Sequence, residues 1–249
     1  MAALVEKIAK QALQTFDFAS PHWERSLKDN FGKLASLMNQ LTYRDVNIQP
    51  RTEEPPLRRS PRGRPASYDD PAPVTYMPIC NHQFFTMGIF LLKGGERIPL
   101  HDHPEMHGIC RVLYGTVAIR SYNRLDPSTT VQPPLPEFDA PLPPWQRNSL
   151  LPCTANGEVQ LNENSEACVL EPLVGNLHEI VAVDGPAAFL DVLAPPYDHD
   201  GSTDRDCHYY RPLTPQNPAQ TDVHWLMRIS QPRDFWCDAE PYPGPAVSV

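Results

Sequence analysis

The sequence is short of the features that mark membrane-bound, secreted or disulfide-bonded proteins. No apolar run in its 249 residues approaches the roughly 18 residues that a membrane-spanning helix needs. The N-terminus shows no apolar segment followed by a small-residue cleavage site, the pattern of a secretion signal. The six cysteines contain no Cys-x-x-Cys pair and no regular spacing, which argues against a disulfide framework. We therefore expect a cytoplasmic protein with reduced thiols and no membrane association.

Positive charge is also scarce. Lys and Arg number 21 against 30 Asp and Glu, so the formal net charge is −9. Nucleic-acid binding depends on clustered basic residues that displace counterions, and this balance therefore argues against a nucleic-acid partner. An acidic surface instead suits cationic substrates. The length fits one well-cored domain with an accessory segment, and we expect it to be a monomer.

Residues 1–45 are predicted to form a helical segment that packs on the outside of the main domain. Two stretches carry apolar residues three or four apart, which is the period of an amphipathic helix. In the first, the apolar positions are Leu4, Ile8, Ala12 and Phe16, and in the second they are Leu27, Phe31, Leu34, Met38 and Leu41. Between them, Ser20 and Pro21 are interpreted as the N-cap and first residue of the second helix.

Two proline-rich stretches divide the rest of the chain. Residues 46–75 hold seven prolines and five arginines, which predicts a stiff, solvated linker. The arginines could alternatively form a localisation signal or an anion-binding patch. Residues 127–144 hold seven more prolines and are predicted to be a surface excursion between strands.

Residues 76–249 are predicted to form the main domain, and their pattern favours short strands. No segment with a helical period separates the β-rich runs, so a parallel sheet with crossover helices is not expected. We predict an all-β fold with accessory N-terminal helices, closed into an antiparallel barrel. The later strands are expected at residues 158–160, 168–170, 178–183 and 187–193.

A histidine motif indicates a metal site in this barrel. His101 and His103 are two residues apart, so in an extended strand both side chains point to one face. His178 follows Gly175, which permits a sharp turn into a second strand that could supply a third nitrogen. The alternative is a strand that simply exposes two imidazoles. The nearby glycines at positions 95 and 115 fit the barrel motif and favour the metal site.

The motif lacks the carboxylate ligand that such barrels usually offer. The positions three or four intervening residues after His103 hold His107 and Gly108, so three neutral imidazoles are expected to make up the ligand set. A ferrous ion held this way keeps its 2+ charge and several open positions, which suits an anionic ligand such as a thiolate together with dioxygen. The sequence therefore points to thiol oxidation.

Longer strings carry a resemblance to one family. The elements Gly95-x5-His101-x-His103 and Gly175-x2-His178 resemble the two motifs of the cupin superfamily, whose fold is a double-stranded β-helix or jelly roll. The sequence also resembles the cupin thiol dioxygenases, which comprise the animal cysteamine (2-aminoethanethiol) dioxygenases and the plant cysteine oxidases. The strings that carry this are HDHPEMHGICRVLYGTVAIRSY (101–122), GNLHEIVAVDGPAAFLDVLAPPYD (175–198), RDCHYYR (205–211) and DFWCDAEPYPGP (234–245).

The resemblance implies a non-haem Fe(II) enzyme with His101, His103 and His178 as ligands. Such an enzyme inserts both atoms of dioxygen into a thiol, converting cysteamine to hypotaurine. It also oxidises the N-terminal cysteine of proteins to cysteine sulfinic acid, an oxygen-sensing step toward their degradation. Both substrates place a thiol two carbons from a free amine.

Four further residues are candidates beside the metal. Asp191 could face the cavity and pair with the substrate ammonium, or could be an exposed strand residue. Tyr197 could donate a hydrogen bond to bound oxygen, or could only pack. The resemblance implies a thioether crosslink between Cys207 and Tyr209, whereas the alternative is an uncrosslinked thiol and ring.

Two neighbours of the histidine pair are not expected to be ligands. Asp102 should point to the opposite face from His101 and His103. His107 is interpreted as a structural residue or as one that supports a ligand.

Two functional alternatives stay open: another metal-dependent cupin enzyme acting on a carbon substrate, and a barrel that binds a metal without catalysis. Structural metal sites are normally closed by four protein ligands, which weighs against the second.

Overall fold

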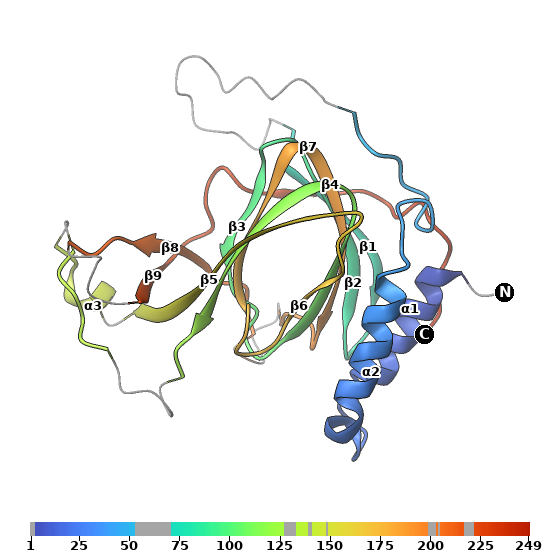
Figure 1. Ribbon diagram of the computed structural model, residues 1–249, viewed down its shortest axis with the longest axis horizontal. Coiled ribbons are helices and arrows are strands. Elements are labelled where there is room, and N and C mark those ends of the chain that lie inside the picture. The colour runs from blue at the N-terminus through green and yellow to red at the C-terminus, as the bar shows by residue number, and fades with distance from the viewer. Residues whose placement is uncertain are drawn as a thin grey trace.

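The computed structural model describes residues 3–52, 71–126, 133–138, 141–147, 149–198, 203, 205–216 and 222–249. Its strands join into one sheet that curls into a barrel, with two helices packed on one side (Figure 1). The elements in chain order are α1 (Leu4–Thr15), α2 (Trp23–Met38), β1 (Val74–Asn81), β2 (Thr86–Leu92), β3 (Arg97–His101), β4 (His107–Arg124), α3 (Pro144–Arg147), β5 (Leu150–Asn162), β6 (Cys168–Leu170), β7 (Leu177–Ala194), β8 (Tyr209–Leu213), β9 (Val223–Ile229) and β10 (Cys237–Ala239).

The barrel closes through the two longest strands, β4 and β7. They pair antiparallel along most of their 18 residues each, and the path β7–β3–β8–β9–β5–β4 returns to β7. The predicted antiparallel barrel is therefore confirmed. The strands expected separately at residues 178–183 and 187–193 are one strand, β7, which bends at Gly185 (φ 120°).

Gly115 makes the matching bend in β4. Its backbone has φ 73°, a left-handed conformation that side chains disfavour. A Cβ there would also collide with the backbone of Pro186 and Ala187 in β7. Glycine at this position therefore permits the register shift between Tyr114 and Thr116, beyond which β4 and β7 pair again.

The helices form the predicted layer against the outside of the barrel. Ile8, Phe16 and Met38 are fully buried in one core cluster with Ile89 of β2 and Leu190 of β7. The apolar periodicity therefore identified the correct helix faces. Figure 1 shows α1 and α2 side by side against β1 and β2.

The expected start of the second helix was wrong. The helix begins at Trp23, and its N-cap is His22, which makes no side-chain capping bond. Ser20 and Pro21 instead form a turn, in which the Trp23 N–H donates to the Ser20 carbonyl at 3.2 Å. Proline is favoured both at the second position of a turn and at the first position of a helix, so the Ser-Pro pair did not distinguish the two.

The predicted linker is described only at its two ends. Val46 and Ile48 are buried in the helix–barrel core, and β1 begins at Val74. Residues 53–70, with four of the five arginines, lie outside the described residues, as do residues 127–132 and 139–140 of the second proline-rich stretch. None of the helices in the described ranges is long and apolar enough to cross a membrane.

Candidate metal centre

Three imidazoles converge inside the barrel. His101 ends β3 and lies opposite His178 of β7 in the strand register, and His103 follows two residues later. The ring centroids are 4.7 to 4.8 Å apart. One ligand nitrogen from each ring lies within 4.8 Å of the others, and the Nε2 atoms of His103 and His178 are 3.2 Å apart. This spacing suits a single metal ion.

The two histidines of the His-x-His motif point toward the same space, but different backbone structures place them there. Only His101 lies in a strand, whereas His103 occupies the turn after it, where its carbonyl accepts from the Met106 N–H at 3.0 Å. Asn176 fixes that turn. Its Oδ1 accepts from the His103 N–H at 3.2 Å, and its Nδ2 donates to the His103 carbonyl at 2.7 Å.

Sequence reasoning missed Asn176. The residue stands inside the Gly-Asn-x-His element, but only the glycine and the histidine were interpreted. Its buried side chain joins the backbone just before β7 to the turn that carries His103. The sequence feature that could have identified it is an asparagine, whose amide both donates and accepts hydrogen bonds, close to a predicted ligand.

Each imidazole has a partner for its outward nitrogen. His101 Nδ1 lies 2.8 Å from the Pro99 carbonyl, and His103 Nδ1 lies 2.7 Å from the Tyr197 hydroxyl. The backbone of Gly175 faces the His178 ring and raises its pKa, against the larger effect of burial. Protons held on the outward nitrogens leave the three Nε2 lone pairs pointing inward, which is the tautomer that a metal requires.

The electrostatics also suit a cation. Burial lowers the pKa of His101, and it lowers the pKa values of His103 and His178 much further. All three rings are therefore neutral near pH 7 and able to donate. Among the described residues, the group of converging ligand atoms contains no carboxylate and no thiol, as the motif predicted. The set fits a borderline divalent ion such as Fe(II) and leaves coordination positions open.

Asp102 points away from the three imidazoles, as predicted. Its carboxylate accepts from the His208 N–H at 2.8 Å and from the Tyr210 hydroxyl at 2.7 Å. Both partners lie at the start of the β8 segment, and the Asp102 N–H donates to the His208 carbonyl at 3.1 Å. Asp102 therefore anchors this segment to the metal-site turn.

Tyr197 has a different place from the one expected. Its hydroxyl donates to the Asp102 carbonyl at 2.6 Å and faces His103 Nδ1, so its proton is not directed at a cavity for oxygen. Burial raises the pKa of Tyr197 well above its usual value, which keeps the hydroxyl protonated. The geometry makes Tyr197 a positioning residue for His103.

Replacing Tyr197 by Phe should weaken metal binding by about 10- to 100-fold, the usual effect of removing the partner of a ligand histidine. The Nδ1–H of His103 would lose its acceptor while the packing of the ring remains. Competition of the protein with a chelator for Fe(II) measures this. Tyr122→Phe, the same change at a buried tyrosine of β4 whose ring packs on His224 and not on the three imidazoles, is the control and should bind as the unmodified protein does. Equal affinities for both variants would contradict the role.

His107 does not join the three imidazoles. Its ring lies 6.3 Å from both Phe16 and Phe31, centroid to centroid, at the contact between the helices and the barrel. Burial lowers its pKa, so the neutral ring packs there. The interpretation of His107 as a structural residue agrees with this placement.

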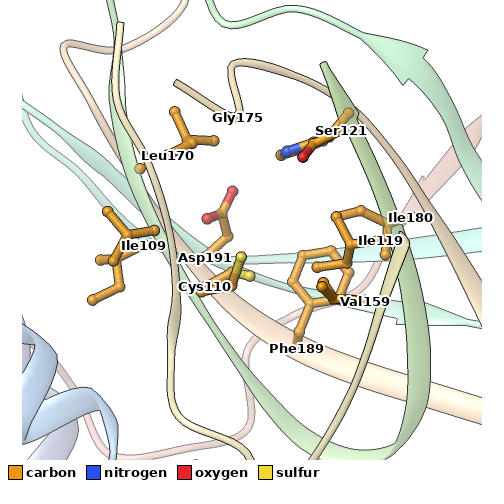
Figure 2. A pocket seen from close by; sticks show the side chains of 14 residues that line it. Ile109, Cys110, Ile119, Ser121, Val159, Leu170, Gly175, Ile180, Phe189 and Asp191 are labelled. Atoms are coloured by element: carbon orange, nitrogen blue, oxygen red, sulfur yellow. The ribbon is translucent and has the colours of Figure 1, made fainter. Parts of the chain in front are cut away.

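A cavity with a volume of about 60 Å³ extends from His178 to Asp191. Its walls include Ile109, Ile180 and Phe189, and Figure 2 shows the Asp191 carboxylate directed into it. Burial raises the pKa of Asp191 to about 7. The expected cavity-facing carboxylate is therefore present, at the end of a largely apolar space that begins at a candidate ligand.

Cys207 lies beside both candidate tyrosines. Its thiol interacts with the hydroxyl groups of Tyr197 and Tyr209, and burial raises its pKa to about 11. Tyr209 begins β8 opposite His101, and their ring centroids are 6.5 Å apart. The Cys-x-Tyr pair is thus in contact next to the imidazoles. All six cysteines carry free thiols.

A closed antiparallel barrel with three histidines converging inside it is consistent with the cupin jelly roll that the sequence predicts. The chain belongs to the PCO_ADO family, whose model matches residues 37–247. It is 45% identical to 2-aminoethanethiol dioxygenase of Mus musculus and 42% identical to that of Homo sapiens, each alignment covering 99% of this chain and 97% of the relative. Plant cysteine oxidase 1 of Arabidopsis thaliana is 28% identical, over 79% of this chain and 60% of the relative.

The solved structures that resemble this chain include much more distant proteins. KdgF from Halomonas sp. is 12% identical, with a TM-score of 0.34 over 51% of this chain and 82% of that one.

Proposed function

We propose that this protein is a non-haem Fe(II) thiol dioxygenase that uses O₂ to oxidise cysteamine to hypotaurine and protein N-terminal cysteine to cysteine sulfinic acid. The observation that carries the proposal is a set of three neutral imidazoles, without a carboxylate, of which His178 lines the cavity that also holds the Asp191 carboxylate. The names of the mouse, human and plant relatives support it.

His101, His103 and His178 would hold the ion through their Nε2 atoms. A bound ferrous ion supplies open positions for a thiolate and dioxygen and the electrons that activate the oxygen. The protein fixes the orientation of each ring through Pro99, Tyr197 and Gly175. Because none of the described residues adds an anionic ligand to the three imidazoles, the ion would keep its full charge for the thiolate of the substrate.

Asp191 is the proposed partner of the substrate amine. A buried carboxylate is costly when it is alone, and an ammonium group placed beside it offsets that cost. The apolar walls exclude water, which strengthens the pairing. A thiol held near His178 and an ammonium held near Asp191 would select molecules with both groups a short distance apart.

The cavity also suits the N-terminus of a longer chain. Val159 and Val169 line it, yet they are 49% and 41% exposed, so the cavity opens to solvent beside them. A peptide could insert its first residue and leave the rest outside. Oxidation of that residue would then act as the oxygen-dependent step toward degradation of the protein that carries it. The cytoplasmic location and the monomeric state stay predictions.

The test compares three substrates with the Fe(II)-loaded protein: cysteamine, a peptide that begins with free cysteine, and the same peptide acetylated at its N-terminus. Cysteamine and the free peptide should each gain two oxygen atoms, about 32 mass units, with matching oxygen uptake. The acetylated peptide lacks the charge and donors that Asp191 would engage, so it should react at least about tenfold more slowly. Equal rates for the two peptides contradict the amine site, and iron binding without thiol oxidation favours the non-catalytic barrel.

A second prediction concerns the proposed thioether between Cys207 and Tyr209. A bond between Cys207 Sγ and a ring carbon of Tyr209 removes two hydrogens, with dioxygen as the oxidant, so aerobic incubation with iron and cysteamine should lower the mass by about two units. Peptide mapping locates the loss, and Cys207→Ser should abolish it. We expect this variant to change turnover only modestly, since it retains all three imidazoles. A Cys207 thiol that stays fully alkylatable would disprove the crosslink and leave the proposed activity standing.

A further inference from the structure

Two cysteines outside the imidazole group face each other across neighbouring strands. Cys110 of β4 lies directly opposite Cys168 of β6 in the antiparallel register, and each thiol shifts the pKa of the other. Both are free thiols, and both are partly accessible. Opposed residues in an antiparallel pair have Cβ atoms about 4.5–5.5 Å apart. This approaches the separation that a disulfide spans, so little backbone movement would join them.

The two thiols lie in the wall of the substrate cavity. Cys110 and Cys168 line the same space as Asp191 and His178. Cys110 is also the register partner of Asp191 across β4 and β7. Figure 2 shows the Cys110 side chain beside the Asp191 carboxylate. A dithiol and a buried carboxylate therefore face one small ligand space.

The two thiols are not equivalent. The neighbouring Cys110 thiol lowers the pKa of Cys168, while the Cys168 thiol and burial raise the pKa of Cys110 well above its usual value. Thiol–disulfide exchange begins with attack by the more acidic thiol as its thiolate. Cys168 is therefore suited to attack, and Cys110 is suited to complete the exchange.

We propose that Cys110 and Cys168 form a thiol–disulfide exchange site for small disulfides that carry ammonium groups, which Asp191 attracts into the cavity. The Cys168 thiolate attacks one sulfur of the disulfide RSSR, forming a Cys168–S–S–R bond and releasing RS⁻, which takes a proton to give RSH. The Cys110 sulfur then attacks Cys168 Sγ and releases the second RSH. Overall, one RSSR and two protein thiols give one Cys110–Cys168 disulfide and two RSH, so the substrate disulfide is the oxidant.

The consequence for turnover rests on the proposed function. A disulfide of an amine-thiol is no substrate for a thiol dioxygenase, but its reduction here would release the thiol inside the cavity where it is oxidised. The exchange itself needs no metal. The two proposals can therefore fail separately.

The test uses the reduced full-length protein and cystamine, the disulfide of cysteamine, followed by alkylation and non-reducing peptide mapping. We expect a Cys110–Cys168 linked pair that forms at least about tenfold faster than the adduct at exposed Cys237, because the carboxylate and the acidic thiol assist only the first. Dithiothreitol should reverse the link, which separates it from a thioether at Cys207. Unreacted Cys110 and Cys168 after Cys237 has reacted would overturn the proposal.

Variants separate the two thiol roles. Cys110→Ala should stop at a mixed disulfide on Cys168, a gain of about 75 mass units for one cysteamine less two hydrogens. Cys168→Ala should slow adduct formation at Cys110 to the rate of Cys237 or below. Cys80→Ala removes a partly buried thiol of β1 and should leave the link unchanged. A mixed disulfide at Cys110 in place of Cys168 would reverse the assigned roles and overturn that step.

The carboxylate is tested with a neutral reagent. Bis(2-hydroxyethyl) disulfide should form the link about tenfold more slowly than cystamine, and Asp191→Asn should remove this difference. Equal rates in the unmodified protein would overturn the ammonium preference. Oxygen uptake with cysteamine, measured on the same sample, reports on the proposed function independently of the link.

Discussion

Replacing His178 by alanine should abolish iron binding and thiol oxidation while leaving the barrel folded. The change removes one of three nitrogen donors, and no carboxylate or thiol among the described residues converges on the remaining pair. Loss of a partner of a ligand costs about 10- to 100-fold in affinity, so loss of the ligand itself should cost at least about 100-fold. Iron content after dialysis and oxygen uptake with cysteamine measure the effect. Normal iron content with full activity would exclude His178 as a ligand.

His107→Ala is the matched control. His107 is also a partly buried histidine at a strand end, but its ring packs on Phe16 and Phe31 and not on the other imidazoles. The variant should retain most of its activity and iron. It should instead lower the free energy of unfolding by about 1–2 kcal/mol, because it removes two ring contacts between the helices and the barrel. Loss of iron in this variant would place His107 among the ligands.

The metal-binding part of the site was predictable because it is local in sequence. His101 and His103 are close together, and Gly175 with His178 forms a second short element. The antiparallel register then brings His101 opposite His178. We predicted that His101 and His103 point to one face because both lie in one strand. This reason holds only for His101, because His103 lies in a turn whose direction is set by Asn176.

The supporting contacts could not be predicted, because they depend on register between distant strands. Cys110 meets Cys168 and Asp191 only because β4 pairs with β6 on one side and β7 on the other. Tyr197 reaches His103 across 94 residues of sequence. A one-residue shift in either pairing would move these side chains to the opposite face, and composition and spacing do not fix that shift.

The fold followed from the sequence where the hydrophobic period was strong. The helix faces with Ile8 and Met38 were correct because burial against a barrel imposes a period near 3.6 residues. The bend of β7 at Gly185 was read as a strand end, since glycine commonly breaks a strand pattern. Here the bend is matched by Gly115 in β4, and pairing continues on both sides of it.

Asp191→Asn should raise the KM for cysteamine by about 10- to 100-fold, with a smaller change in kcat. A hydrogen bond to a charged group contributes about 1.5–3 kcal/mol, and each 1.4 kcal/mol is tenfold. The pKa of Asp191 is raised to about 7 by burial, so below that pH the empty site holds a neutral carboxyl that attracts an ammonium weakly. The KM of the unmodified protein should therefore rise as the pH falls from 8 to 6, and the asparagine variant should lack this component. The same pH dependence of KM in both proteins would contradict the assignment of Asp191 as the partner of the substrate amine.

The same substitution, although it should weaken substrate binding, should raise the stability of the substrate-free protein. Because the folded protein holds the Asp191 proton more tightly than the unfolded chain does, this residue makes the free energy of unfolding fall as the pH rises from about 4 to about 7. Without substrate at pH 8, the buried charge is uncompensated, so Asp191→Asn should melt at a higher temperature than the unmodified protein. The difference should shrink as the pH is lowered through 7 toward 4, and saturating cysteamine should reverse its sign at pH 8, because only the carboxylate gains from the ammonium. If the variant and the unmodified protein melt at the same temperature at pH 8, both without and with cysteamine, Asp191 neither bears a buried charge nor contacts the amine.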